Sequence, residues 1–232
     1  MKIPFVFTFA GDLPRAIANR LVKSIKRVMP NSYILQQTDT LTDAIGGCEV
    51  IRIERGPDFA EFFLRHLKEL DLPRFIKIDY DCVVQKDLAP LFEGRWQVGL
   101  TRRDEADKTL SEEMAIRQPY NNGVIFSNGK HSFFNEVYDR YMAIHDRDGW
   151  MDAQEAVREA AGATRTRLEE FPCSIYNYTP SMPDEDLRDK YIVHYKGMRK
   201  HWALDTADML GAMREGQRVG GMVRRWMAER LK

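Results

Sequence analysis

The segment FIKIDYDCVVQKDL, residues 75–88, places two carboxylates directly after a short apolar run. The letters FIKI predict a buried β-strand, and Asp79 and Asp81 then point to the same side of an extended backbone. Unpaired carboxylates at the end of a buried strand are costly unless a cation lies between them. Oxygen ligands suit Mg²⁺ and Mn²⁺, so the pattern indicates a divalent-cation site, although two solvated loop acids would give the same letters.

The composition is that of an ordinary globular protein. The chain has 232 residues, of which 44% are hydrophobic and 30% charged. This length predicts one domain over residues 1–232, long enough to bury a substantial core. The 35 basic and 35 acidic residues give a formal net charge of zero. That balance argues against a protein that coats nucleic acid, and we expect no nucleic-acid partner.

The cysteines and the first residues bear on cellular location. Cys48, Cys82 and Cys173 match no zinc motif, which predicts reduced thiols. The segment MKIPFVFTFAGD lacks the long apolar core and the cleavage site of a secretion signal. No stretch approaches the roughly 20 apolar residues that span a bilayer. We therefore expect a cytoplasmic protein.

Strand and helix patterns alternate along the first part of the chain, which predicts an α/β sheet with crossover helices. Strands are expected at residues 3–10, 32–39, 49–54, 75–78, 96–104, 120–128 and 190–195. Helices are expected at residues 14–29, 59–70, 133–145 and 152–161, a helical tail at about 203–232, and a polar loop or lid at 104–119. Three strands end in polar residues, at 8–12, 79–81 and 102–104, and should open onto one ligand-binding edge.

A second motif strengthens the cation-site hypothesis. The segment IVHYKGMRKHW, residues 192–202, has the pattern H-x-x-G-x-x-K-x-W and follows a short expected strand. His194 offers an imidazole ligand, Gly197 lets the backbone approach a ligand, and Lys200 offers a cation for phosphate. Together with Asp79 and Asp81, these residues indicate a site for a divalent ion and a nucleotide diphosphate. A lone histidine on a strand would more often be structural.

At this point the chain resembles the retaining glycosyltransferases of family 8, which include glycogenin and bacterial lipooligosaccharide galactosyltransferases. Four segments carry the resemblance in chain order: IPFVFTFAGD, FIKIDYDCVVQKDLAPLFE, YNNGVIFSN and IVHYKGMRKHW. The resemblance implies a GT-A fold, the Rossmann-like nucleotide-diphospho-sugar transferase fold with a mixed, mostly parallel sheet flanked by helices. It also implies transfer of a sugar from a nucleotide-diphosphate donor.

The resemblance further implies residue roles. Asp79, Asp81 and His194 would bind the metal, usually Mn²⁺, and Asp79 would also reach the ribose. The diphosphate would meet Gly197 and Lys200. The remaining implied contacts are Thr8 and Asp12 to the nucleoside, Arg65, Arg103 and Asp104 to the donor sugar or phosphate, and Asn121 to the transferred sugar. A turn at residues 121–123 and surface charge at 103–104 are the plainer alternatives.

The chain departs from the family in two places. The family has an adjacent Asp-Gln pair near the reacting carbon, whereas WMDAQEAV places Ala153 before Gln154 and displaces the acid to Asp152. The acid after the first strand, Asp12, follows an extra Phe-Ala-Gly, so the nucleoside contacts are set only to within a residue or two. Gln154 and Asp152 are nevertheless the candidate catalytic residues, with Asn121.

The resemblance thus implies a retaining hexosyltransferase that uses Mn²⁺ or Mg²⁺ and a UDP-linked sugar donor. The acceptor is an unknown saccharide, lipid-linked or protein hydroxyl. A catalytically impaired nucleotide-sugar-binding protein is the alternative. A sugar-nucleotide pyrophosphorylase would need a glycine-rich basic loop, of which FAGDLPR is a poor version.

The C-terminal segment GQRVGGMVRRWMAERLK, residues 216–232, combines apolar residues at helical spacing with basic residues. Such a helix can lie on an anionic membrane surface, here the inner membrane face. More often an apolar stripe of this kind packs against its own domain. Both alternatives remain open from the sequence.

Overall fold

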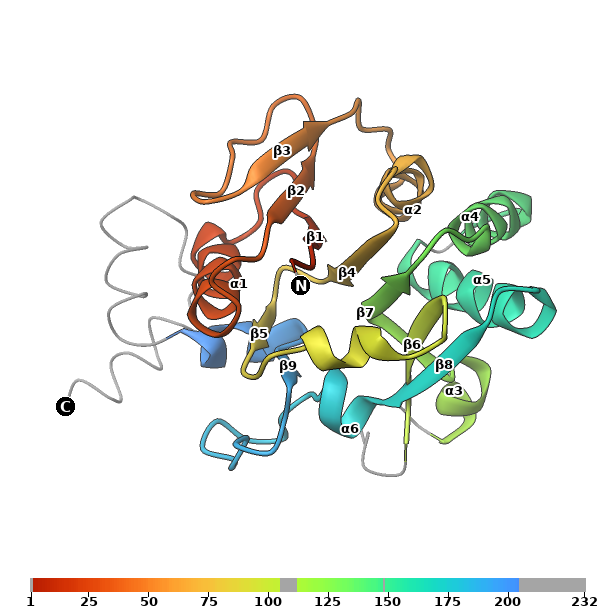
Figure 1. The fold of residues 1–232 in the computed structure, drawn as a ribbon. Coiled ribbons are helices and arrows are strands. Elements are labelled where there is room, and N and C mark those ends of the chain that lie inside the picture. Colours follow the sequence, from red (N-terminus) through yellow and green to blue (C-terminus); the bar gives the residue numbers. More distant parts are fainter. Residues whose placement is uncertain (1, 105–111, 148, 205–232) are drawn as a thin grey trace.

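A seven-stranded sheet organises the computed structural model, which describes residues 2–104, 112–147 and 149–204 (Figure 1). Its strands are β1 Phe5–Thr8, β2 Ile34–Thr38, β3 Glu49–Arg52, β4 Arg74–Ile78, β6 Val98–Arg102, β7 Tyr120–Asn128 and β8 Leu168–Pro172. They lie in the order β3-β2-β1-β4-β7-β6-β8. Strand β7 runs antiparallel to β4 and β6, whereas the other paired strands are parallel. The expected mixed, mostly parallel sheet is confirmed.

Helices cover both faces of this sheet (Figure 1). They are α1 Arg15–Val28 on one face and α2 Phe59–Glu69, α4 Phe133–Ala143 and α5 Trp150–Ala163 on the other. The alternation of side chains along β1 separates the two hydrophobic cores. Phe5 and Phe7 pack in the cluster that contains α1, whereas Val6 packs in the cluster that contains α2, α4 and α5.

A second, two-stranded sheet brings distant parts of the chain together. Strand β5, Cys82–Val84, pairs antiparallel with β9, Ile192–His194, and Cys82 lies opposite His194. Short helical turns flank this sheet: η1 Ala89–Glu93, α6 Cys173–Tyr176 and η2 Gly197–Ala203. The register places His194 next to the carboxylates that precede β5, although more than 100 residues separate them in the sequence.

The structure contains elements that the sequence analysis did not expect, among them the short strand β5, the turns η1 and α6, and strand β8. Strand β8 was not expected, because LEEFP has two exposed acids where this edge strand faces solvent. The expected loop at 104–119 contains the helix α3, Glu112–Arg117. The other expected helices begin and end within about two residues of those observed, since apolar spacing set their extent.

The expected C-terminal tail lies almost wholly outside the described residues, in 205–232, as does the membrane contact assigned to it. Within residues 2–104, 112–147 and 149–204, no helix is long and apolar enough to cross a membrane. The cytoplasmic location and the single domain over residues 1–232 remain predictions.

Candidate active site

A cavity of about 870 Å³ opens where β1, β4 and β6 end. Helix α5 and the turn η2 complete its walls. Ten of the residues singled out in the sequence line it: Thr8, Asp12, Asp79, Asp81, Arg103, Asn121, Gln154, His194, Gly197 and Lys200. The three polar strand ends therefore meet in one cavity, as parallel strands with crossover helices require.

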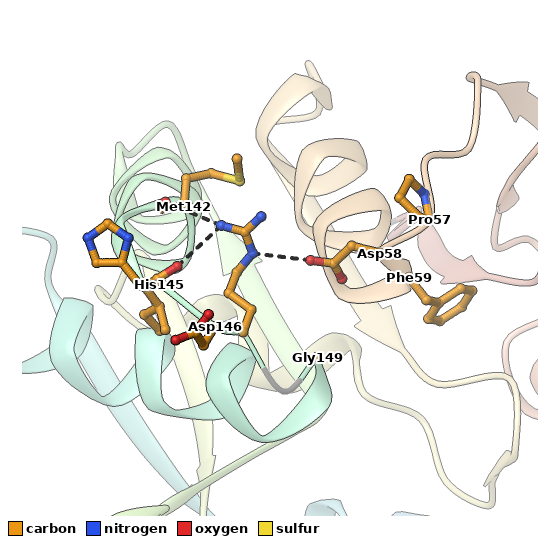
Figure 2. A pocket seen from close by; sticks show the side chains of 9 residues that line it. Pro57, Asp58, Phe59, Met142, His145, Asp146 and Gly149 are labelled. Atoms are coloured by element: carbon orange, nitrogen blue, oxygen red, sulfur yellow. Dashed lines mark hydrogen bonds and ion pairs between the residues drawn. The ribbon is translucent and has the colours of Figure 1, made fainter.

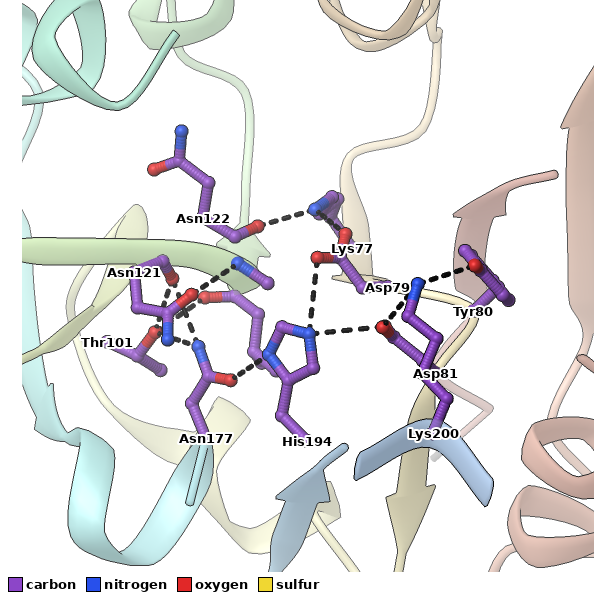
Figure 3. A network of polar contacts seen from close by, with 12 residues as sticks. Lys77, Asp79, Tyr80, Asp81, Thr101, Asn121, Asn122, Asn177, His194 and Lys200 are labelled. Carbon is purple, nitrogen blue, oxygen red and sulfur yellow. Dashed lines mark hydrogen bonds and ion pairs between the residues drawn. The ribbon is translucent and has the colours of Figure 1, made fainter. Parts of the chain in front are cut away.

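At one side of the cavity, three ligand atoms converge (Figure 3). His194 Nε2 lies 3.1 Å from Asp81 Oδ1 and 3.5 Å from Asp79 Oδ2. Asp81 Oδ1 is buried and accepts no hydrogen bond from the described residues. A buried carboxylate oxygen in that state is rare and indicates a missing partner such as an ion.

Asn177 fixes the orientation of the His194 ring. Its Nδ2 donates to the backbone oxygen of Asn121 at 3.0 Å and to Thr101 Oγ1 at 2.7 Å. Its Oδ1 therefore faces His194 Nδ1, at 2.8 Å, and accepts the proton that this nitrogen carries. In a neutral imidazole, Nε2 then presents a lone pair to the two carboxylates, which is the arrangement of a metal ligand.

Gly123 supplies the space that the ring occupies. A Cβ atom at this position would lie 2.3 Å from His194 Cε1, closer than real contacts allow. Asn121 Oδ1 accepts from the Gly123 backbone N–H at 3.1 Å, which holds the segment against the ring. The Asn-Asn-Gly segment is therefore part of β7 and a support of the cluster, not a turn before a strand.

Each carboxylate gives its second oxygen to a lysine. Lys200 Nζ lies 3.1 Å from Asp81 Oδ2 and donates to Tyr80 OH at 2.6 Å, while Lys77 Nζ donates to Asp79 Oδ1 at 2.5 Å. Burial by itself would raise the pKa of Asp81, but His194 and Lys200 together hold that pKa well below its usual range. Asp81 is therefore ionised and available as a ligand.

The cluster fits a hard divalent cation. His194 Nε2, Asp79 Oδ2 and Asp81 Oδ1 would hold the ion, and the remaining positions face the cavity. The sulfur of Cys82 also lies within 4.8 Å of ligand atoms of Asp81 and His194. Cys82, however, belongs to the hydrophobic core and does not line the cavity, so Asp79 is the better third ligand.

The far side of the cavity is a network of polar side chains. Gln154 is buried, donates to Gln118 Oε1 at 3.1 Å and accepts from Arg103 Nη2 at 3.2 Å. Two buried atoms that line the cavity, Asn121 Nδ2 and Thr8 Oγ1, have no hydrogen-bond partner among the described residues. These atoms are available to a polar ligand.

Three of the predicted site residues do not line the cavity. Arg65 donates to the backbone oxygen of Glu54 and pairs with Glu61 at 3.3 Å. Asp104 accepts from the backbone and hydroxyl of Ser174. Asp152 lies in the first turn of α5 beside Gln154 but outside the lining. Arg65 and Asp104 thus have contacts within the chain, Asp152 lies outside the lining, and the roles of all three at the site remain predictions.

Several lining residues were not expected from the sequence. The cavity is lined by five basic side chains, Arg55, Arg103, Lys196, Arg199 and Lys200, and by three acids, Asp12, Asp79 and Asp81. In a chain of zero net charge, this local excess of positive charge suits an anionic ligand. The aromatic side chains of Phe63 and Trp150 also line the cavity. Sequence spacing gave no signal for Arg55, because only the fold brings the loop before α2 to the cavity.

A second hollow, of about 670 Å³, lies between the start of α2 and the connection from α4 to α5 (Figure 2). Asp58 and Arg147 dominate it. Asp58 accepts from the backbone N–H groups of Ala60 and Glu61, from Tyr141 OH and from Arg147 Nε. Its carboxylate is therefore satisfied by the chain itself, as expected of a helix N-cap.

Solved structures share this fold. The galactosyltransferase LgtC, in complex with donor and acceptor sugar analogues, has a TM-score of 0.60 at 17% identity, covering 91% of this chain and 93% of its own. GlyE of Streptococcus pneumoniae has a TM-score of 0.58 at 15% identity, covering 93% of this chain and 64% of its own. A glycosyltransferase involved in glycosylation of the major capsid of PBCV-1 has a TM-score of 0.55 at 14% identity, covering 87% of this chain and 97% of its own.

No protein-family model and no curated protein matches the sequence. At identities of 14 to 17%, the likeness to solved structures establishes the fold. The chain has the GT-A glycosyltransferase fold, and the resemblance inferred from its four segments is confirmed at that level.

Proposed function

We propose that this protein is a metal-dependent glycosyltransferase that transfers a sugar from a nucleotide-diphosphate donor to an acceptor hydroxyl. The observation that carries the proposal is the convergence of His194 Nε2, Asp79 Oδ2 and Asp81 Oδ1 beside a cavity with excess positive charge. The volume and the lining, which combines apolar and aromatic side chains with several charged groups, suit a nucleotide-sugar. The GT-A fold supports the same reading, and the donor class is taken from the sequence resemblance as a UDP-sugar.

In this proposal, different residues bind different parts of the donor. Thr8 and Asp12, after β1, would bind the nucleoside, and Gly197 and Lys200 the diphosphate. Gly197 has a φ of +56°, which favours glycine in the turn that faces the cavity. Asp79, Asp81 and His194 would hold a Mn²⁺ or Mg²⁺ ion, which would supply positive charge to stabilise the departing diphosphate.

The sugar end would be formed by Asn121, Gln154 and Arg103. The buried Nδ2 of Asn121 would donate to a sugar hydroxyl, since it has no partner among the described residues. Gln154 is held in place by Gln118 and Arg103, so its orientation is fixed before the donor binds. Retention of configuration is part of the proposal through the family resemblance, and the acceptor would be a saccharide, lipid-linked or protein hydroxyl.

One observation favours the alternative, a binding protein of this fold that has lost transfer. Ala153 is fully buried where the family has an acid, and Asp152 lies outside the cavity lining. Only Gln154 of the expected pair therefore reaches the cavity. Slow release of free sugar from the donor would be expected of an enzyme and not of this alternative.

The test is thermal unfolding with a panel of UDP-, GDP-, ADP- and CMP-sugars, each with Mn²⁺ and with EDTA. A ligand that binds the folded state raises the melting temperature by mass action. We expect a shift with a UDP-sugar that requires Mn²⁺ and disappears in Asp81→Ala. No shift with any nucleotide, with or without metal, would refute the function. Hydrolysis of the donor that binds would then separate the enzyme from the binding protein.

A further inference from the structure

Lys77 is a buried lysine within the sheet, at a position where the sequence pattern predicts an apolar residue. It lies in β4 and is 1% exposed. Its Nζ donates to Asp79 Oδ1 and to the backbone oxygen of Asn122, both at 2.5 Å (Figure 3). The same atom lies 4.4 Å from the centre of the Phe63 ring. A lysine is almost never fully buried unless it is paired, and here its partner is a candidate metal ligand.

The position of Lys77 follows from strand geometry. Residues two apart on β4 point to the same side, so Lys77 and Asp79 share one side of the sheet. The lysine holds Oδ1 of Asp79, which leaves Oδ2 directed at His194 Nε2, 3.5 Å away. Lys77 does not itself line the cavity, and therefore acts on a ligand only through Asp79.

Each carboxylate of the cluster faces a lysine before any ion binds. Lys77 faces Asp79 and Lys200 faces Asp81, so that two ammonium groups neutralise two carboxylates. A divalent cation on its own would enter a site that offers little net attraction and contains two nearby positive charges.

A diphosphate changes this balance, because it brings several negative charges to the same place. We propose that Lys77 makes tight binding of the divalent cation conditional on the diphosphate, by neutralising Asp79 in its absence. This inference rests on the proposed function and deepens it. The ion and the nucleotide then bind cooperatively, and each raises the affinity for the other by the same factor. Lys77 is a positioning residue that sets the strength of this coupling.

The experiment measures Mn²⁺ binding from the loss of the free-ion electron paramagnetic resonance signal, without nucleotide and with UDP. The wild type should bind Mn²⁺ weakly alone and at least about tenfold more tightly with UDP. Lys77→Gln, which can still donate a hydrogen bond, and Lys77→Met should bind Mn²⁺ alone roughly tenfold more tightly than the wild type. The gain on adding UDP should shrink accordingly.

Two controls separate charge from structure. Lys68→Met removes a lysine that also pairs with an aspartate, Asp139 at 3.4 Å, and lies over the Tyr138 ring, but does not line the cavity. It should leave Mn²⁺ binding unchanged. Lys77→Arg keeps the charge and should behave as the wild type. A purely structural role for Lys77 would instead make Mn²⁺ binding weaker in the Gln and Met variants.

The outcomes distinguish this inference from the proposed function. If the wild type binds Mn²⁺ tightly without UDP, or if a folded Lys77→Gln binds it no more tightly than the wild type, the inference is wrong and the function can stand. If the wild type binds no Mn²⁺ even with UDP, the metal-dependent function fails and takes the inference with it. The wild-type measurement decides the first point even where a variant does not fold.

Discussion

Two aspartates of this protein, Asp58 and Asp81, have opposite surroundings. Both lie beside a hollow, and in both, contacts outweigh burial and lower the pKa of the carboxyl. Asp58 accepts from two backbone N–H groups, from a tyrosine and from Arg147, the last of which Figure 2 shows. Asp81 shares one oxygen with Lys200, and its buried second oxygen faces His194 without a hydrogen bond (Figure 3).

The comparison shows how a structural carboxylate differs from a ligand. The chain supplies every partner of Asp58, so this side chain has nothing left to offer another molecule. At Asp81 the fold holds the carboxylate ionised and leaves one oxygen to an external partner. Native proteins pair nearly all buried polar atoms, so an exception beside a cavity indicates binding.

The largest expected effect is at Asp81. Asp81→Asn keeps the shape but removes the charged ligand, so turnover of the donor identified by thermal unfolding should fall more than about a hundredfold. Release of UDP measures this loss, with far-ultraviolet circular dichroism as a check on folding. If the folded variant retains metal-dependent turnover, Asp81 is not a metal ligand.

The next effect tests the space beneath the imidazole. Gly123→Ala should displace the His194 ring and weaken binding of UDP with Mn²⁺ by at least about tenfold, since an outer support of a metal ligand costs 10- to 100-fold when lost. Gly162→Ala, in α5 with no atom near the added methyl group, is the matched control and should leave binding intact. If isothermal titration calorimetry gives the same affinity for both variants, the space at Gly123 is not needed to position the His194 ring.

A smaller effect, on stability alone, is expected at the satisfied carboxylate. Asp58→Ala removes the N-cap of α2 and should lower the free energy of unfolding by about 1–2 kcal/mol, measured by urea denaturation. Binding of UDP with Mn²⁺ should not change. Loss of that binding in a folded Asp58→Ala would break the distinction between the two aspartates.

The smallest effect concerns histidines: His66, like Asp58, lies outside the cavity, whereas His194 lines it. His66 is buried against Phe62, outside the cavity lining, and burial lowers its pKa from 6.5 to about 4. Between these two pH values, His66 binds a proton in the unfolded chain but not in the native state. The free energy of unfolding therefore decreases as the pH falls from about 6.5 to 4.

His66→Gln, which cannot gain that proton, should make the melting temperature fall less steeply over this range of pH. The exposed His145 provides the matched control, and His145→Gln should keep the wild-type slope. If the two variants show the same slope as the wild type, burial of His66 does not contribute to acid sensitivity.

The sequence alone determined the features that depend on neighbouring residues. Apolar spacing set α1 and α2, and the run of letters before Asp79 set β4, because these patterns follow the geometry of single elements. The pairing of the D-x-D motif with the His194 segment came from residue chemistry, and the resemblance gave the fold. The sequence did not predict strand β8, because this edge strand has exposed acids and shows little alternation of apolar residues.

Only the tertiary structure decided which side chains meet. Arg65 and Asp104, which the sequence analysis assigned to the site, do not line the cavity, whereas Arg55 does. Asn177 contacts His194, which the sequence did not indicate. The tertiary structure also revealed that Lys77, one letter within an apolar strand, pairs with Asp79 in the core. These contacts depend on the register of strands and on loops distant in sequence, and the free energy of a buried charge depends on partners that only the folded chain supplies.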